Sequence, residues 1–258
     1  MTDRPVTPAT ASQIAAARAA ANALGLYFGL PDPTDPDPTG PDPTGPGPAN
    51  DRDGWRPAAL LYEPGAGQGG AGGPLDELLD AVQARLGGCE RRVAASLFYQ
   101  GYAARLLSPQ LGCLATSGCV PAVPTGELNW REPAAEMIQL GLPPGPGWQG
   151  PAGPLLAQLL VQSFTAHLHP LATAIRARVH LSADLLTGNA ASALISGLRL
   201  LDRRLAGGWR PFAVRALAEP QLNGSGTLTA AEPGFTRRSC CLYYRTHSGG
   251  LCGDCPLS

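Results

Sequence analysis

Residues 237–256 read RRSCCLYYRTHSGGLCGDCP and hold the densest chemistry in this chain. Four of the seven cysteines fall within sixteen positions there, in the pattern C-C-x10-C-x2-C, as Cys240, Cys241, Cys252 and Cys255. Four thiols gathered this closely indicate a metal ion, an iron–sulfur cluster or a disulfide knot. We therefore expect the upstream chain to fold as a platform for this segment.

The cysteine spacing separates these possibilities only in part. A tetrahedral zinc site usually takes its ligands from two C-x2-C hooks, and the segment has one, at 252–255. In extended backbone Cys240 and Cys241 point to opposite sides, so both reach one small ion only if the chain turns back sharply. A [2Fe–2S] cluster has two metal corners and takes four cysteines. Spacing alone favours the cluster and leaves zinc and disulfides open.

The same segment resembles the C-terminal signature of the FhuF-like ferric-siderophore reductases. RRSCCLYYR at 237–245 and CGDCPL at 252–257 fit that family's C-C-x10-C-x2-C motif without a gap. A weaker similarity lies at Gly188-Asn189, where the family commonly has a Gly-Asn at the start of a helix. The resemblance implies that all four cysteines are ligands of a [2Fe–2S] cluster.

The resemblance also implies a function. It indicates an oxidoreductase acting on metal ions, a ferric-siderophore reductase of iron uptake, in which the cluster cysteines carry electrons for the one-electron reduction of chelated Fe(III) to Fe(II). The expected partners are a ferric siderophore, of the hydroxamate type, and an electron donor such as a ferredoxin or a flavin reductase. Two other functions stay open: a non-enzymatic iron–sulfur electron carrier or sensor, and a zinc-stapled siderophore-binding module.

Cationic side chains supply the candidate substrate-binding residues. Arg237, Arg238 and Arg245 flank the cysteines; they can donate to cluster sulfurs and raise the reduction potential, or hold an anionic chelate. Trp130 and Arg131 place an aromatic ring beside a cation, which suits a pocket wall or an ordinary strand edge. Both interpretations are kept for each group.

Composition excludes several classes of protein. The formal net charge is −1 and all 19 basic residues are arginines, so the chain has no electrostatic footprint for nucleic acid. The sequence lacks a secretory signal pattern and an apolar run near the ~20 residues that span a bilayer. We expect a cytoplasmic protein without a transmembrane segment, in which thiols stay reduced; loose peripheral membrane contact is compatible with this composition.

The predicted fold class is α+β, with a mainly helical body, a small antiparallel sheet and the C-terminal iron–sulfur segment. We expect four parts, which are an N-terminal helix in 1–30, a Pro/Asp/Gly-rich disordered loop over 31–56, a FhuF-like helical and mixed body over 57–236, and the cluster-binding segment over 237–258.

Apolar periodicity predicts the elements of the body. Helices are expected at 10–24, 75–86, 91–107, 155–168, 169–179 and about 182–205, the last interrupted at Gly188-Asn189. Residues 57–62 are expected to form a strand and 222–229 a strand or a long loop, and 242–244 have β character. Cys89, Cys113 and Cys119 are expected to be buried structural thiols. The glycine-rich 65–70 stretch has no βαβ context and is not expected to bind a nucleotide.

Overall fold

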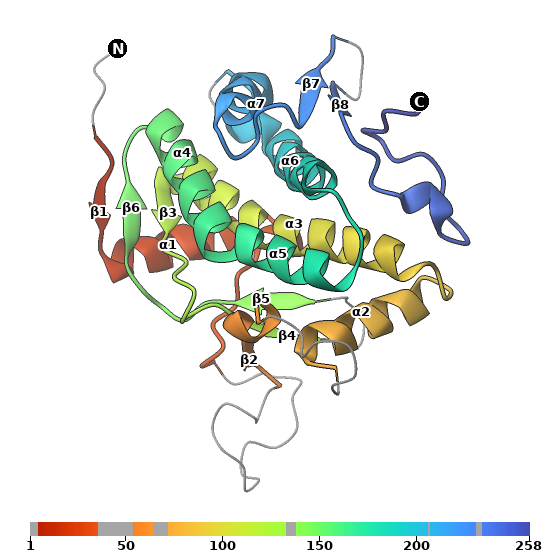
Figure 1. The fold of residues 1–258 in the computed structure, drawn as a ribbon. Helices are drawn as coiled ribbons and strands as arrows, with labels where there is room; N and C mark the ends of the chain where they lie inside the picture. The colour runs from red at the N-terminus through yellow and green to blue at the C-terminus, as the bar shows by residue number, and fades with distance from the viewer. Residues whose placement is uncertain (1–4, 36–53, 64–71, 133–137, 206, 231–233) are drawn as a thin grey trace, which may run out of the picture.

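The computed structural model describes residues 5–35, 54–63, 72–132, 138–205, 207–230 and 234–258. Within these ranges helices pack around one central helix, and small antiparallel sheets lie at the periphery (Figure 1). The α+β class predicted from the sequence is confirmed. The Pro/Asp/Gly-rich loop and the 65–70 stretch lie largely outside the described residues.

The helices account for most of the described chain. The α-helices are α1 (Ala11–Asn22), α2 (Pro74–Arg85), α3 (Arg91–Ser117), α4 (Ala152–Ser163), α5 (His169–Arg178), α6 (Ala183–Leu200) and α7 (Trp209–Ala218). The 3₁₀-helices are η1 (Leu26–Phe28), η2 (Ala58–Leu61), η4 (Asp202–Arg204) and η5 (Tyr243–Arg245), and η3 (Phe164–Leu168) is a π-helical turn between α4 and α5.

The central helix is α3, which is 27 residues long and buried along most of its length. It packs most extensively on α6, then on α1 and α2. Small residues allow these close approaches. A Cβ on Gly112 would meet the Cβ of Ala21 in α1 at 3.0 Å, and one on Gly197 of α6 would meet Leu111 at 3.0 Å. Helix α3 is therefore the axis on which the other elements are arranged.

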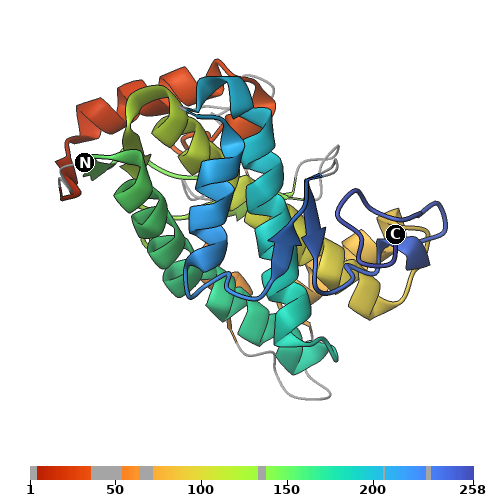
Figure 2. The same ribbon diagram turned by 90° about the horizontal axis from the view of Figure 1, so that it is seen from above.

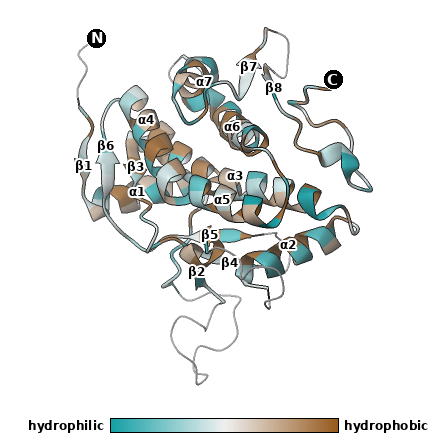
Figure 3. Ribbon diagram, viewed as in Figure 1, coloured by the Kyte–Doolittle hydropathy of each residue, from teal (hydrophilic) through white to brown (hydrophobic). Residues whose placement is uncertain are grey.

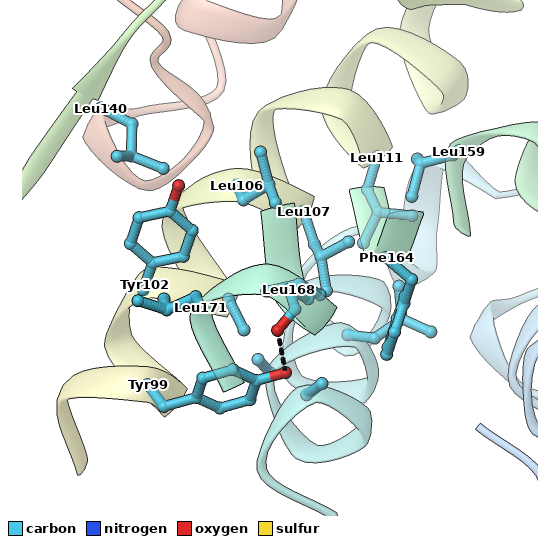
Figure 4. Close-up of a cluster of buried hydrophobic side chains, with 14 of the residues drawn as sticks. Tyr99, Tyr102, Leu106, Leu107, Leu111, Leu140, Leu159, Phe164, Leu168 and Leu171 are labelled. Carbon is cyan, nitrogen blue, oxygen red and sulfur yellow. Dashed lines mark hydrogen bonds between the residues drawn. The ribbon is translucent and has the colours of Figure 1, made fainter. Parts of the chain in front are cut away.

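The core on one side of α3 joins it to α4, the π-helical turn and α5 (Figure 4). Leu107 and Leu111 of α3 face Phe164 and Leu168 there. The Tyr99 hydroxyl donates a hydrogen bond (3.3 Å) to the carbonyl of Leu168, the last residue of the π-helical turn. The helices turn their hydrophobic sides inward (Figure 3). Burial of such side chains contributes roughly 25 cal/mol per Å².

Three antiparallel sheets are present in the described part. The strands are β1 (Thr7–Ala9), β2 (Arg56–Pro57), β3 (Cys119–Pro121), β4 (Asn129–Arg131), β5 (Gln139–Gly141), β6 (Gly147–Gln149), β7 (Gly226–Leu228) and β8 (Phe235–Arg237). Their orders are β1-β6-β3, β2-β4-β5 and β7-β8. The sheet content is thus spread over three small sheets, where one was expected.

Several element predictions were wrong in detail. Most of the 57–62 stretch forms the 3₁₀-helix η2 (Ala58–Leu61), and only Pro57 of it belongs to a strand, β2. Residues 243 and 244 belong to the 3₁₀-helix η5 and not to a strand. Helix α3 continues ten residues past its predicted end at Leu107. Gly188-Asn189 does not interrupt α6, because the α-helix runs unbroken through both residues.

The C-terminal segment lies along one end of the helical body, over the N-terminal parts of α3 and α6 (Figures 1 and 2). Two residues just before α3 contact this segment. Glu90 accepts from Arg245, and Gly87 lies next to His247. None of the described helices combines the length and apolar character needed to cross a membrane.

Candidate metal centre

The C-x2-C hook is tied to the body through strand β8. The amide of Arg237, the last residue of β8, donates to the Asp254 carbonyl (3.0 Å), and the Cys255 amide closes the hook on the Cys252 carbonyl (3.1 Å). The buried Asp254 carboxylate accepts from the Ser192 hydroxyl of α6 (2.6 Å). The hook is therefore held on a strand and a helix together.

The adjacent cysteines are positioned by a sharp turn. Leu242, directly after Cys241, has φ 71°, the one positive φ of a non-glycine residue in the described chain. Its left-handed conformation costs a residue with a side chain roughly 1–2 kcal/mol. Such strain is kept where the surrounding structure requires it. In this turn the Leu242 amide points back to the sulfur of Cys240 (3.4 Å).

The segment reaches α6 at Gly188. A Cβ on this residue would lie 2.5 Å from the Ser239 hydroxyl oxygen. That hydroxyl donates to the Asp184 carbonyl (2.9 Å), an accessible carbonyl in the first turn of α6. Absence of a side chain at Gly188 thus lets the residue before the cysteine pair lie directly on the helix.

All four cysteine sulfurs of the segment have polar partners. The Leu242 amide donates to Cys240 Sγ and the Leu257 amide to Cys255 Sγ, each at 3.4 Å. The sulfurs of Cys241 and Cys252 lie 3.6 Å apart, and all seven cysteines of the chain are free. Burial raises the pKa of the Cys241 thiol, while Arg237 acts in the opposite direction.

Arg237 lies beneath the sulfurs, with only 1 % of its surface exposed. One terminal nitrogen donates to Cys252 Sγ (3.1 Å) and the other to the Asn189 side-chain carbonyl (2.6 Å). Burial disfavours the charged guanidinium, but the nearby cysteine sulfurs raise the pKa of Arg237 overall. A chelate outside the protein cannot touch this side chain in the described conformation.

Asn189 connects three segments of the site. Its amide nitrogen donates to both the carbonyl (2.8 Å) and the hydroxyl (3.0 Å) of Ser96 in α3. The Ser96 hydroxyl in turn donates to the Cys241 carbonyl (2.7 Å). Asn189 and Ser96 are fully buried, so this network satisfies polar groups that would otherwise be costly to bury.

The residues fit a [2Fe–2S] cluster. Two thiolates bound at about 2.3 Å to one tetrahedral metal lie about 3.8 Å apart, close to the Cys241–Cys252 separation of 3.6 Å. Arg237 Nε is buried without a hydrogen-bond partner, although buried donors are nearly always satisfied. An acceptor supplied by a bound anionic centre answers that need. A site for a single metal ion is not formed, because no three His, Cys, Asp or Glu side chains among the described residues are grouped tightly enough to bind one ion.

The remaining candidate residues occupy different surroundings. Arg238 is exposed, and its guanidinium lies near Gly224, in the turn before β7. Arg245 forms an ion pair with Glu90 and donates to the Tyr244 hydroxyl (3.2 Å). Trp130 is fully buried, and Arg131 stacks its guanidinium 4.6 Å from the Trp55 ring centre.

Trp130 and Arg131 belong to β4, on the other side of α3 from the C-terminal segment (Figure 1). The structure does not bring these two residues together with the cysteines. Among the three arginines of the C-terminal segment, Arg237 donates to a cysteine sulfur, whereas Arg245 pairs with Glu90. The residues that the sequence interpretation missed are Ser96, Ser192 and Asp254. Only the Gly-Asn similarity pointed to this part of α6, and no local pattern marked Ser96.

Two cavities of the described part lie away from the cysteines. One, of about 460 Å³, is lined by Arg18 and Asn22 of α1 together with Trp55 and Arg131; the other, of about 270 Å³, is lined by Tyr27 and neighbours. Helix α1 meets α3 at Gly112, 16 residues beyond Ser96, which is roughly 24 Å along an α-helix. Neither cavity includes a residue of the C-terminal segment.

Fold and site together define an iron–sulfur segment docked on a mainly helical α+β body. Comparison with known families supports this class: residues 237–257 match the FhuF 2Fe-2S C-terminal domain. The matched residues include all four clustered cysteines, and the match assigns a [2Fe–2S] cluster to the segment. No curated protein matches the chain significantly.

Proposed function

We propose that this protein is a cytoplasmic ferric-siderophore reductase, in which Cys240, Cys241, Cys252 and Cys255 ligate the cluster. The observation that carries the proposal is the match of 237–257 to the FhuF 2Fe-2S domain, on a segment that lies at the edge of the fold. When bound, a [2Fe–2S] centre supplies one electron at a time. Fe(III) held by hard oxygen donors needs one electron to become Fe(II), which those donors hold less well.

The C-terminal segment has an inner side, which faces the helical body, and an outer side, which faces solvent. On the inner side Cys241 and Cys255 are each only 2 % exposed and lie against the helical body. On the outer side the segment exposes apolar side chains, Tyr243 (37 %), Tyr244 (43 %), Leu251 (55 %) and Leu257 (58 %).

This outer side supports approach of a chelate to the cysteines. A hydroxamate siderophore has an apolar linker and a polar iron-binding end, so exposed Tyr and Leu side chains together with Arg238 suit it. Neither of the two cavities includes a residue of the C-terminal segment. We therefore place chelate binding, through Arg238 and Arg245, on this open surface, and expect weak discrimination among ferric chelates because the surface encloses none of them.

A single-turnover experiment tests the proposal. The purified protein is reduced anaerobically, freed of excess reductant and mixed with a ferric trihydroxamate in the presence of a colorimetric Fe(II) chelator. We expect the visible absorption of the oxidised cluster to return and one Fe(II) to appear per cluster. Reoxidation by oxygen but not by the chelate would indicate a carrier or sensor instead, and a colourless, zinc-containing protein would indicate the zinc-stapled module. The Cys252→Ala variant provides the control.

A further inference from the structure

The polar network of Arg237, Asn189 and Ser96 beneath the cysteines leaves one buried donor without an acceptor, which a purely structural network would not do. Arg237 presents three nitrogens, and the two terminal ones are used by Cys252 Sγ and by Asn189. The third, Nε, is buried without a partner. The side chain is 1 % exposed, so water cannot satisfy it from the surface. A buried, charged donor of this kind costs free energy unless an anionic acceptor is supplied.

We propose that Arg237 donates hydrogen bonds to the sulfur atoms of the bound cluster, and that Asn189 and Ser96 are positioning residues that hold its guanidinium in that direction. The inference goes beyond the reductase function and rests only on the presence of the cluster. It replaces the alternative in which Arg237 binds the chelate.

The direction of the guanidinium is set by Asn189. The Asn189 amide cannot rotate freely, because its nitrogen is held by two acceptors on Ser96. Its oxygen therefore stays turned toward Arg237. A guanidinium is a rigid planar fork, so fixing one terminal nitrogen also fixes the direction of the others.

Ser96 extends this arrangement to the cysteine pair itself. Its hydroxyl donates to the Cys241 carbonyl while accepting from Asn189. Residues of α3, α6 and the C-terminal segment are thus joined in one hydrogen-bonded chain. Displacing the centre of this chain must move Arg237 relative to Cys241 and Cys252 together.

The consequence for the cluster has a definite sign. Reduction adds a negative charge, and hydrogen bonds to the sulfurs together with a nearby positive charge stabilise the more negative form. Arg237 therefore raises the reduction potential. Removing the guanidinium lowers the potential, and misdirecting it lowers the potential by a smaller amount.

The test is a dye-mediated redox titration of the holoprotein, followed by visible absorption and without any siderophore. For Arg237→Gln we expect at least a tenfold fall in the equilibrium constant for reduction against a fixed reference couple, equivalent to 59 mV for one electron. Arg237→Lys keeps the charge but not the fork, so it should recover only part of the loss. Asn189→Leu keeps the arginine at position 237 but removes the hydrogen bond that directs its guanidinium. We expect it to lower the potential as well, by a smaller factor than Arg237→Gln.

The matched control is Arg238→Gln, which removes an exposed charge one residue away. We expect less than a threefold change for it. Equal shifts in Arg237→Gln and Arg238→Gln would overturn the proposal, because the effect would then be general electrostatics. Should Arg237→Gln fail to retain a cluster, Asn189→Leu and Ser96→Ala decide the matter, and unchanged potentials in both would overturn it. Chelate reduction can fail in the single-turnover assay without affecting this outcome.

Discussion

At the scale of single residues, the cysteines differ in what surrounds them. Cys252 accepts from a buried guanidinium, whereas Cys119 is a buried thiol at the start of β3, in a sheet with β1 and β6. The two side chains are the same thiol, but their surroundings differ, so we expect substitution of Cys252 and of Cys119 to affect the protein differently.

We expect Cys252→Ala to lose most of the bound iron and the visible absorption, because a [2Fe–2S] cluster needs four protein ligands. Cys119→Ala serves as the matched control and should keep about two irons per chain. Iron and sulfide analysis of anaerobically purified protein measures both. Retention of full iron content in Cys252→Ala would contradict the assignment of this ligand.

The left-handed residue after the cysteine pair supports a second prediction. Leu242 is partly buried against the core, so a substitution has to preserve its apolar character. Leu242→Val introduces a β-branched residue at φ 71°, which that conformation tolerates worst. Strain of about 1 kcal/mol corresponds to roughly fivefold.

We accordingly expect Leu242→Val to lose its cluster to excess EDTA about fivefold faster than wild type. Leu242→Met is the control, since it keeps an unbranched Cβ and a similar volume. Loss of absorbance with time measures both variants. Identical rates for the Val and Met variants would show that the turn does not control retention of the cluster.

At the scale of elements, α6 depends on a glycine for its contact with the C-terminal segment. Glycine inside a helix costs roughly 1 kcal/mol of stability relative to alanine. At Gly188 this cost is offset by a contact that alanine would not allow. That contact is with Ser239: a Cβ at position 188 would lie only 2.5 Å from the Ser239 hydroxyl oxygen. The helical preference and the packing requirement therefore oppose each other at this position.

A double-mutant cycle separates the two effects. In the wild-type background Gly188→Ala must displace Ser239 and break its bond to Asp184, a loss of about 1 kcal/mol that offsets the helical gain. In the Ser239→Ala background the same change should stabilise the protein by about 0.5–1 kcal/mol. Urea unfolding measures the free energies of all four proteins. Equal effects of Gly188→Ala in both backgrounds would contradict the packing explanation.

At the scale of the whole molecule, a buried polar chain joins segments far apart in sequence. His167 of the π-helical turn places Nε2 at 2.7 Å from the Val123 carbonyl and Nδ1 at 2.7 Å from the Tyr62 hydroxyl. Because a carbonyl only accepts, Nε2 carries the proton and Nδ1 accepts from Tyr62. The Tyr62 oxygen is then left to accept from Tyr102 (2.5 Å). A neutral imidazole fits every partner in this chain.

Stability should therefore fall in mild acid. Burial lowers the pKa of His167 from 6.5 to about 4, so between these values the unfolded chain binds more protons than the folded one. Stability is fully present above pH 6.5 and declines as the pH falls toward 4. We expect wild type to lose about 2 kcal/mol between pH 7 and pH 5 through this residue.

The variant His167→Gln should lack this part of the pH dependence. His180→Gln, which removes an exposed imidazole, should keep it. Urea unfolding followed by far-UV circular dichroism at both pH values gives the comparison. An unchanged pH dependence in His167→Gln would show that another group is responsible.

The described chain shares one hydrophobic core, which runs from Ala9 to Phe235. The sequence periodicity located most of its helices, because one apolar face per helix is a local signal. It missed the last ten residues of α3, because Pro109 removes a helical hydrogen bond and ordinarily ends a helix. Pro109 is buried in the middle of α3, and burial of the surrounding side chains offsets that loss.

The sequence alone determined where the metal-binding chemistry can lie, because four thiols within sixteen positions already limit the ligands that can bind. Only the tertiary structure decided which residues face those thiols. Ser96 and Asn189 lie far from the cysteines along the chain. The bond of Ser96 to Cys241 and that of Asn189 to Arg237 depend on how α3, α6 and the C-terminal segment pack. Arg237 and Arg238 look alike in sequence, yet Arg237 ends strand β8 and Arg238 begins the bend that follows it. One is buried beneath the sulfurs and the other is exposed, and no local pattern says which.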